Sequence, residues 1–104
     1  MTARWIDVGA ADELPRDAHR VYEVDGRFVA VYDVGGERFA IEDVCTHDGN
    51  PLSDGPVEGL EVVCPRHGAR FCLRTGAALS PPAYEPVPSF PVEVRDGRLF
   101  IGVD

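Results

Sequence analysis

The chain has 104 residues, 44% of them hydrophobic and 27% charged, a balance that is typical of one folded domain and excludes disorder over the whole length. The net charge is −8, which argues against a nucleic-acid-binding or membrane-surface protein and favours charge-steered docking with a basic partner. No apolar run approaches the roughly 18 residues of a transmembrane helix, and no signal peptide is visible at the N-terminus. We therefore expect a soluble, cytoplasmic protein whose partners are neither nucleic acids nor membranes.

The composition and the turn signals predict a chain built from strands. Fourteen valines against six leucines favour half-buried strands, and only Ala10–Asp17 suggests a helix, which Pro15 limits to about one turn. Three two-residue turns stand between strand-like runs and predict β-hairpins. The expected strands and turns, in chain order, are His19–Val24, Asp25-Gly26, Arg27–Asp33, Gly35-Gly36, Glu37–Ile41, Pro91–Arg95, Asp96-Gly97 and Arg98–Val103.

The middle of the chain, residues 43–91, differs from these two strand-rich ends. Glycine and proline are frequent there, and the run Ser80–Pro88 cannot form a central strand. We also expect few apolar anchors in this stretch. The sequence thus predicts an all-β domain whose strands carry one long, loop-rich insertion.

Two matched Cys/His pairs in this insertion carry the chemistry. Cys45-Thr46-His47 and Cys64-Pro65-Arg66-His67 form the pattern C-x-H-x16-C-x2-H. A glycine follows each pair, and glycine permits the left-handed turns that a buried metal centre requires. Thiolate and imidazole suit transition metals, and three cysteines are an odd number for a disulfide framework. A metal site is therefore the first hypothesis.

The residues by themselves leave a structural zinc site open as the alternative, because zinc accepts two Cys and two His in a tetrahedron. The one-residue spacing between Cys45 and His47 departs from the usual zinc patterns, however. Outside the two pairs, we interpret Cys72 as a small core residue, His19 as core filler or a solvated side chain, and Trp5 as core or strand-edge packing.

The segments Cys45-Thr46-His47 and Cys64-Pro65-Arg66-His67-Gly68 resemble the ligand motif of Rieske-type [2Fe–2S] proteins. The resemblance implies the Rieske fold, an antiparallel β-sandwich scaffold with a small loop-rich cluster-binding subdomain. The subdomain would cover about residues 43–83 inside a single domain, residues 1–104. It also implies one [2Fe–2S] cluster per chain, with Cys45 and Cys64 on one iron and His47 and His67 on the other.

A chain of this family is expected to be an electron carrier without catalytic residues of its own. The resemblance to soluble Rieske ferredoxins implies a reductase as electron donor and a partner such as a non-haem iron oxygenase as acceptor. A redox-sensing or accessory subunit linked to iron–sulfur cluster assembly is the alternative. An oxygenase in its own right would need a further iron site with two histidines, and only His19 remains after the cluster is satisfied.

Four positions separate this sequence from the high-potential members of the family. Asn50 and Arg66 stand where those members carry a disulfide, and Ala69 and Phe71 stand where they carry a Ser and a Tyr that donate hydrogen bonds to sulfur. Since Ala and Phe have no side-chain donor, we expect a potential near the lower end of the Rieske range, at about −150 mV. The resemblance also places the Pro81-Pro82 loop over one side of the cluster, with a rigid connector as the alternative.

Overall fold

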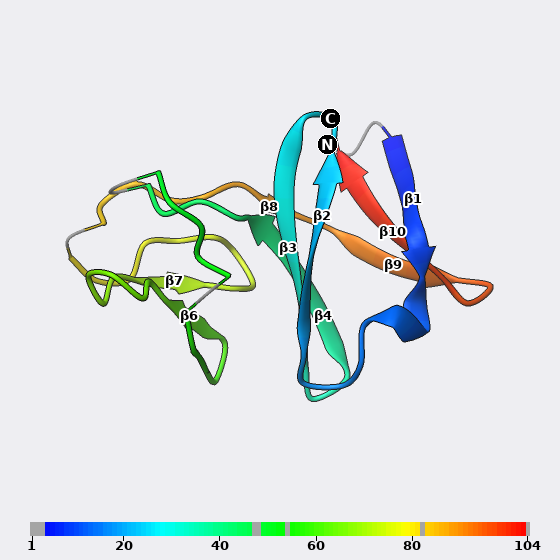
Figure 1. Cartoon of the computed structure of the whole chain (residues 1–104), viewed down its shortest axis with the longest axis horizontal. Coiled ribbons are helices and arrows are strands. Elements are labelled where there is room, and N and C mark those ends of the chain that lie inside the picture. Colours follow the sequence, from blue (N-terminus) through cyan, green and yellow to red (C-terminus); the bar gives the residue numbers. More distant parts are fainter. Residues whose placement is uncertain (1–3, 47–48, 54, 82, 104) are drawn as a thin grey trace.

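Two antiparallel sheets face each other and form the larger part of the molecule (Figure 1). The computed structural model describes residues 4–46, 49–53, 55–81 and 83–103. One sheet has the order β1-β10-β9 and the other has the order β2-β3-β4-β8. Their bounds are β1 Arg4–Ala10, β2 His19–Val24, β3 Arg27–Val34, β4 Glu37–Glu42, β8 Ser89–Phe90, β9 Val92–Arg95 and β10 Arg98–Val103. The expected all-β, antiparallel architecture is confirmed.

The predicted hairpins are present with the predicted turns. Antiparallel ladders join β2 to β3, β3 to β4 and β9 to β10. Both residues of each turn, Asp25-Gly26, Gly35-Gly36 and Asp96-Gly97, have positive φ. This backbone shape matches the right-handed twist of the strands, and Gly, Asn and Asp adopt it at the lowest cost. The turn dipeptides therefore set the register of these hairpins.

β1 is not predicted from the sequence, because Asp7 and Gly9 interrupt its hydrophobic alternation. It pairs with β10 at the other end of the chain, with a β-bulge between Asp7 and Gly9. The helical turn expected within Ala10–Asp17 is confirmed as a 3-10 helix, Ala11–Glu13. No helix within the described ranges is long and apolar enough to cross a membrane.

The space between the two sheets is filled by apolar side chains, which we call the sandwich core. Its buried members are Ala11, Leu14, Val24, Val29, Val31, Ala40, Leu99, Ile101 and Val103. Along β3 the side chains of Val29 and Val31 point into this core, whereas those of Ala30 and Tyr32 point to the other side of the sheet. β3 thus contributes to a second core as well.

That second core belongs to the distal region, residues 43–88, which forms the left part of the molecule in Figure 1. A third antiparallel sheet lies there, with the order β5 Val57–Glu58, β6 Glu61–Val63 and β7 Arg70–Cys72. The buried members of the distal core are Cys45, Leu52, Val62, Cys64, Ala69, Phe71, Leu73, Ala83 and Val87, together with Ala30, Tyr32 and Ile41 of the sandwich.

The expectation of few apolar anchors in the middle of the chain is therefore wrong. Only Ala69, Phe71 and Leu73 follow the period of a strand, and most of the other anchors are separated by glycines, prolines and polar residues. Strands β6 and β7 direct Val62 and Phe71 inward, and loops direct most of the others.

Candidate metal centre

Each of the three cysteines begins a turn with the same backbone hydrogen bonds. The cysteine N–H donates to the carbonyl five residues further on, and the N–H of a glycine four residues further on donates to the cysteine carbonyl. The turns are Cys45–Asn50 (2.7 and 2.7 Å), Cys64–Ala69 (2.7 and 3.0 Å) and Cys72–Ala77 (2.9 and 2.7 Å). We call them the first, second and third cysteine turns.

The glycine of each turn has a left-handed conformation. Gly49, Gly68 and Gly76 have φ values of 77°, 74° and 79°, which L side chains rarely adopt. The role expected of glycine after each Cys/His pair is therefore present in the first two turns. Gly76 is constrained further, because a Cβ there would lie 2.0 Å from the carbonyl oxygen of Val87.

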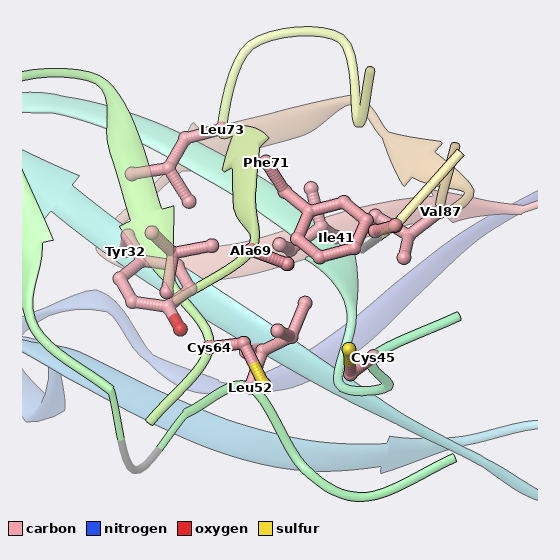
Figure 2. Packing of buried hydrophobic residues seen from close by; sticks show 12 residues of the cluster. Tyr32, Ile41, Cys45, Leu52, Cys64, Ala69, Phe71, Leu73 and Val87 are labelled. Atoms are coloured by element: carbon pink, nitrogen blue, oxygen red, sulfur yellow. The ribbon is translucent and has the colours of Figure 1, made fainter. Parts of the chain in front are cut away.

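The first two turns bring Cys45 and Cys64 into the same buried core. Their exposed fractions are 0% and 1%. In Figure 2 both sulfur atoms lie along one edge of the distal core. Two sulfur donors from separate turns on one edge are what a centre with two cysteine ligands requires.

Of the two histidines in the pairs, the structure describes only His67. His67 is exposed in the second turn, and His47 lies outside the described residues. Within the described ranges, no group of three His, Cys, Asp or Glu side chains gathers as metal ligands. The structure thus unites the two cysteines, and the joining of the two histidines to them remains a prediction. Two buried thiols with an exposed imidazole nearby in sequence fit the mixed ligation of a Rieske centre better than an all-cysteine centre.

Asp43 shapes the loop after Cys45, and the sequence does not single it out. One of its carboxylate oxygens accepts the N–H groups of Leu52 and Ser53, each at 2.8 Å, and the other accepts the Ser53 hydroxyl at 2.8 Å. These bonds close the loop and hold Leu52 in the distal core. An Asp after a strand suggests a local cap, but nothing in the sequence indicates partners ten residues away.

The proline-rich segment packs against the same core. Ala83 and Val87 are buried within it. The hydroxyl of Thr46, in the first turn, donates to the carbonyl of Glu85 at 2.7 Å, and the N–H of Val87 donates to the carbonyl of Gly76, in the third turn, at 2.9 Å. Pro82 lies outside the described residues, so the covering role expected of the Pro81-Pro82 loop stays a prediction, with a rigid connector as the alternative.

Ala69 and Phe71 are both fully buried in the distal core with the two cysteines. The carbonyl of Ala69 accepts the N–H of Cys64, and Figure 2 shows the side chains of Ala69 and Phe71 in the interior of the same core. Neither side chain carries a polar atom, so neither donates a hydrogen bond to sulfur.

The interpretation of Cys72 as a core residue is wrong. It is half-buried, on the face of β7 opposite to the buried Phe71. The hydroxyl of Thr75 is the largest cause of a lowered pKa of the Cys72 thiol. The N–H groups of Thr75 and Arg74 and the Arg74 charge act in the same direction, and burial opposes them. Strand alternation around Phe71 is the signal that points to this placement.

Three side chains at the surface, those of Trp5, His19 and Arg66, contact other parts of the chain. Trp5 lies half-exposed on the edge strand β1, with the Arg95 guanidinium 5.3 Å from its ring, which confirms strand-edge packing. His19 is exposed and stacks on Tyr32 with ring centroids 5.2 Å apart. Arg66, at a position where high-potential members carry a disulfide, instead donates a hydrogen bond to the backbone carbonyl of Pro51 at 2.9 Å.

Comparison with known proteins gives consistent matches. The model of the Rieske [2Fe-2S] domain matches residues 4–91. The chain is 36% identical to the ferredoxin component of the naphthalene 1,2-dioxygenase/salicylate 5-hydroxylase systems of Ralstonia sp, with 100% of both chains covered. These matches confirm the resemblance seen in the ligand motif.

Solved structures agree with the sequence matches. The ferredoxin of carbazole 1,9a-dioxygenase from Nocardioides aromaticivorans IC177 superposes with a TM-score of 0.90 at 30% identity, covering 98% of this chain and 100% of that one. A chain in the complex of reduced oxygenase and oxidized ferredoxin in carbazole 1,9a-dioxygenase gives a TM-score of 0.85 at 36% identity, covering 94% and 92%. The Rieske fold is thus confirmed. Since the family model covers most of its length and a relative matches it from end to end, the chain belongs to the Rieske [2Fe–2S] domain family.

Proposed function

We propose that this chain is a one-electron carrier that passes electrons from a reductase to the terminal oxygenase of a dioxygenase system. In this proposal Cys45, His47, Cys64 and His67 hold its [2Fe–2S] cluster, and the chain works in the cytoplasm. The observation that carries it is the pair of matched turns, which bury two cysteines and leave His67 exposed. A bound cluster of this type supplies one reversible electron.

The two ligand types have different tasks. The cysteine thiolates stay buried in the distal core, where water is excluded. The imidazoles are neutral, so their use in place of two thiolates lowers the negative charge at the centre and makes an added electron easier to hold. The exposed side chain of His67 offers a short path from the centre to a protein that approaches this end of the molecule.

The names of the relatives support an electron carrier rather than an oxygenase. The full-length relative is named as a ferredoxin component, and the solved carbazole 1,9a-dioxygenase complex pairs an oxygenase with a ferredoxin. Reductase and oxygenase are therefore the donor and acceptor that we assign to this chain.

The test begins with anaerobic purification and analysis of iron, acid-labile sulfide and zinc. We expect two irons and two sulfides per chain and, after reduction, the electron paramagnetic resonance spectrum of a Rieske centre. The reduced protein should then return one electron per chain to a terminal oxygenase. Stoichiometric zinc without visible absorption would instead support the structural zinc alternative and overturn the assignment.

A further inference from the structure

One aromatic side chain in the proline-rich segment is almost fully exposed to solvent. Tyr84 is 81% exposed, the highest value among the large hydrophobic side chains of the described residues. Monomeric proteins tolerate single exposed apolar residues, so exposure by itself carries little weight. Tyr84 differs from such residues because its backbone is held in place on both sides and because it lies close to the cysteine turns.

The backbone around Tyr84 is held on both sides. Ala83 before it and Val87 after it are each only 3% exposed and lie in the distal core. The carbonyl of Glu85 accepts the Thr46 hydroxyl at 2.7 Å, and Pro86 restricts its own φ. The ring therefore projects from a segment that is ordered before any partner arrives, which lowers the entropic cost of using it as a contact.

This segment also lies close to the centre. Tyr84 precedes the residue whose carbonyl is bonded to Thr46, which itself directly follows Cys45. From standard backbone dimensions, the Cα of Tyr84 lies within about 12 Å of the Cα of Thr46. The third cysteine turn is bonded to the other end of the segment, through Gly76 and Val87.

An electron-transfer interface centred on the cysteine turns is large enough to include Tyr84. Weak electron-transfer encounters bury up to about 600 Å² on each partner, which corresponds to a disc roughly 28 Å across. A partner centred on the cysteine turns covers the proline-rich segment with such a disc. Tyrosine is among the residues that most often supply binding energy at interfaces.

We propose that Tyr84 is the apolar anchor through which the terminal oxygenase docks on this chain. The inference rests on the proposed function, and the solved complex of a relative with its oxygenase selects the oxygenase as the occupant. Glu85, the exposed neighbour of Tyr84 in the chain, is acidic, and the net charge of −8 favours a basic partner, so charge steers the approach and the ring supplies the apolar contact.

The experiment measures electron transfer from the reduced, cluster-loaded chain to purified terminal oxygenases of carbazole 1,9a-dioxygenase and naphthalene 1,2-dioxygenase by stopped flow. We expect Tyr84→Ala to lower the second-order rate constant about tenfold, which corresponds to about 1.4 kcal/mol. Tyr84→Phe keeps the ring and should stay within about twofold of the unsubstituted chain. Val94→Ala, on the exposed face of β9 in the sandwich, serves as the control and should also stay within about twofold.

Two readouts separate docking from a structural effect. The midpoint potential and the rate of oxidation by ferricyanide should be unchanged in Tyr84→Ala. An unchanged rate with the oxygenases, an equal fall with ferricyanide, a shifted potential, or a loss confined to reduction by the reductase would each overturn the anchor. Failure of the unsubstituted, cluster-loaded chain to reduce either oxygenase would overturn the proposed function and the anchor with it.

Discussion

The sandwich and the distal region both bury apolar side chains, but they hold them by different means. The sandwich uses antiparallel strands of four to eight residues, apart from the two-residue β8. The distal region has strands of two or three residues and relies on cysteine turns and on side-chain bonds such as those of Asp43. Ladders bury surface, whereas turns place single groups. The chemistry of the chain depends on the second kind of region.

The two regions share β3, whose alternate side chains enter the two cores. The contact is reinforced by the N–H of Asp43, which donates to the carbonyl of Phe28 at 2.8 Å, and by Arg74, whose guanidinium lies 5.3 Å from the Phe39 ring centroid. The distal region is therefore joined to the sandwich through β3 and these contacts, while its own loops depend on local hydrogen bonds.

The largest expected effect is the loss of the cluster from the distal region while the sandwich stays folded. Cys64→Ser should abolish cluster binding, because a serine hydroxyl is a poor ligand for iron in this setting and metal binding is coupled to loop order. Iron content and the visible spectrum measure the loss, and hydrogen exchange should show faster exchange in residues 43–88 with the sandwich still protected. Cys72→Ala is the matched control and should keep both irons; retention of two irons in Cys64→Ser would contradict the ligand assignment.

A substitution in the sandwich core tests the opposite case, in which the sandwich is destabilised and the cluster is retained. Ile101 is fully buried in the sandwich core, so Ile101→Ala should lower the free energy of unfolding by about 2–5 kcal/mol. Urea titration followed by the fluorescence of Trp5, on β1, measures the change. The visible spectrum of the folded variant should be unaltered. A variant that loses its centre before it unfolds would show that the regions are less separate than the two cores suggest.

A smaller effect concerns the sulfur-bearing edge of the distal core. Ala69→Ser with Phe71→Tyr adds two side-chain donors, and a hydrogen bond that favours the reduced state by about 1 kcal/mol raises a one-electron potential by about 40 mV. Voltammetry should therefore give about −150 mV for the natural chain and a higher value for the double variant. Val94→Ala, remote from this edge, should leave the midpoint unchanged. An unchanged double variant would mean that the new groups do not reach sulfur.

The smallest effect concerns the reactivity of the Cys72 thiol in the third cysteine turn. Since the pKa of Cys72 is lowered, its thiolate forms at lower pH than that of an ordinary cysteine, and its alkylation by iodoacetamide should speed up at correspondingly lower pH. Thr75→Val removes the largest cause and should move the pH profile upward, whereas Thr46→Val should not. A Thr75→Val profile that coincides with that of the natural chain would show that the hydroxyl does not control this thiol.

What the sequence could predict follows from how local each feature is. The hairpins depend on turn dipeptides such as Asp25-Gly26, whose φ preferences act within two residues, and they are present as predicted. The family could be identified because the spacing of the Cys/His pairs is itself the signal. β1 and most of the distal core depend on partners far away in the chain, and apart from the alternation around Phe71 no local pattern marks them.

The candidate site shows the same division. Cys45 and Cys64 lie in the same buried core, and His47 lies outside the described residues, so the assignment of all four ligands stays a prediction. Asp43 escapes prediction because its partners are reached only after the loop has folded back. Cys72 was open to a better prediction, because the alternation of β7 around Phe71 assigns it to the outer face.

The threefold recurrence of the cysteine turn bears on how such a protein can change over generations. The turn is closed by main-chain bonds and a glycine, and it forms equally around Pro65-Arg66-His67 and around Leu73-Arg74-Thr75. The same backbone shape thus accommodates two different sets of side chains. Inherited variation can replace those side chains while the backbone stays in place. The polar group near the cysteine sulfur then changes, as from His67 in the second turn to Thr75 in the third. A lineage that carries this turn can therefore explore new electrochemistry without first having to rebuild a fold.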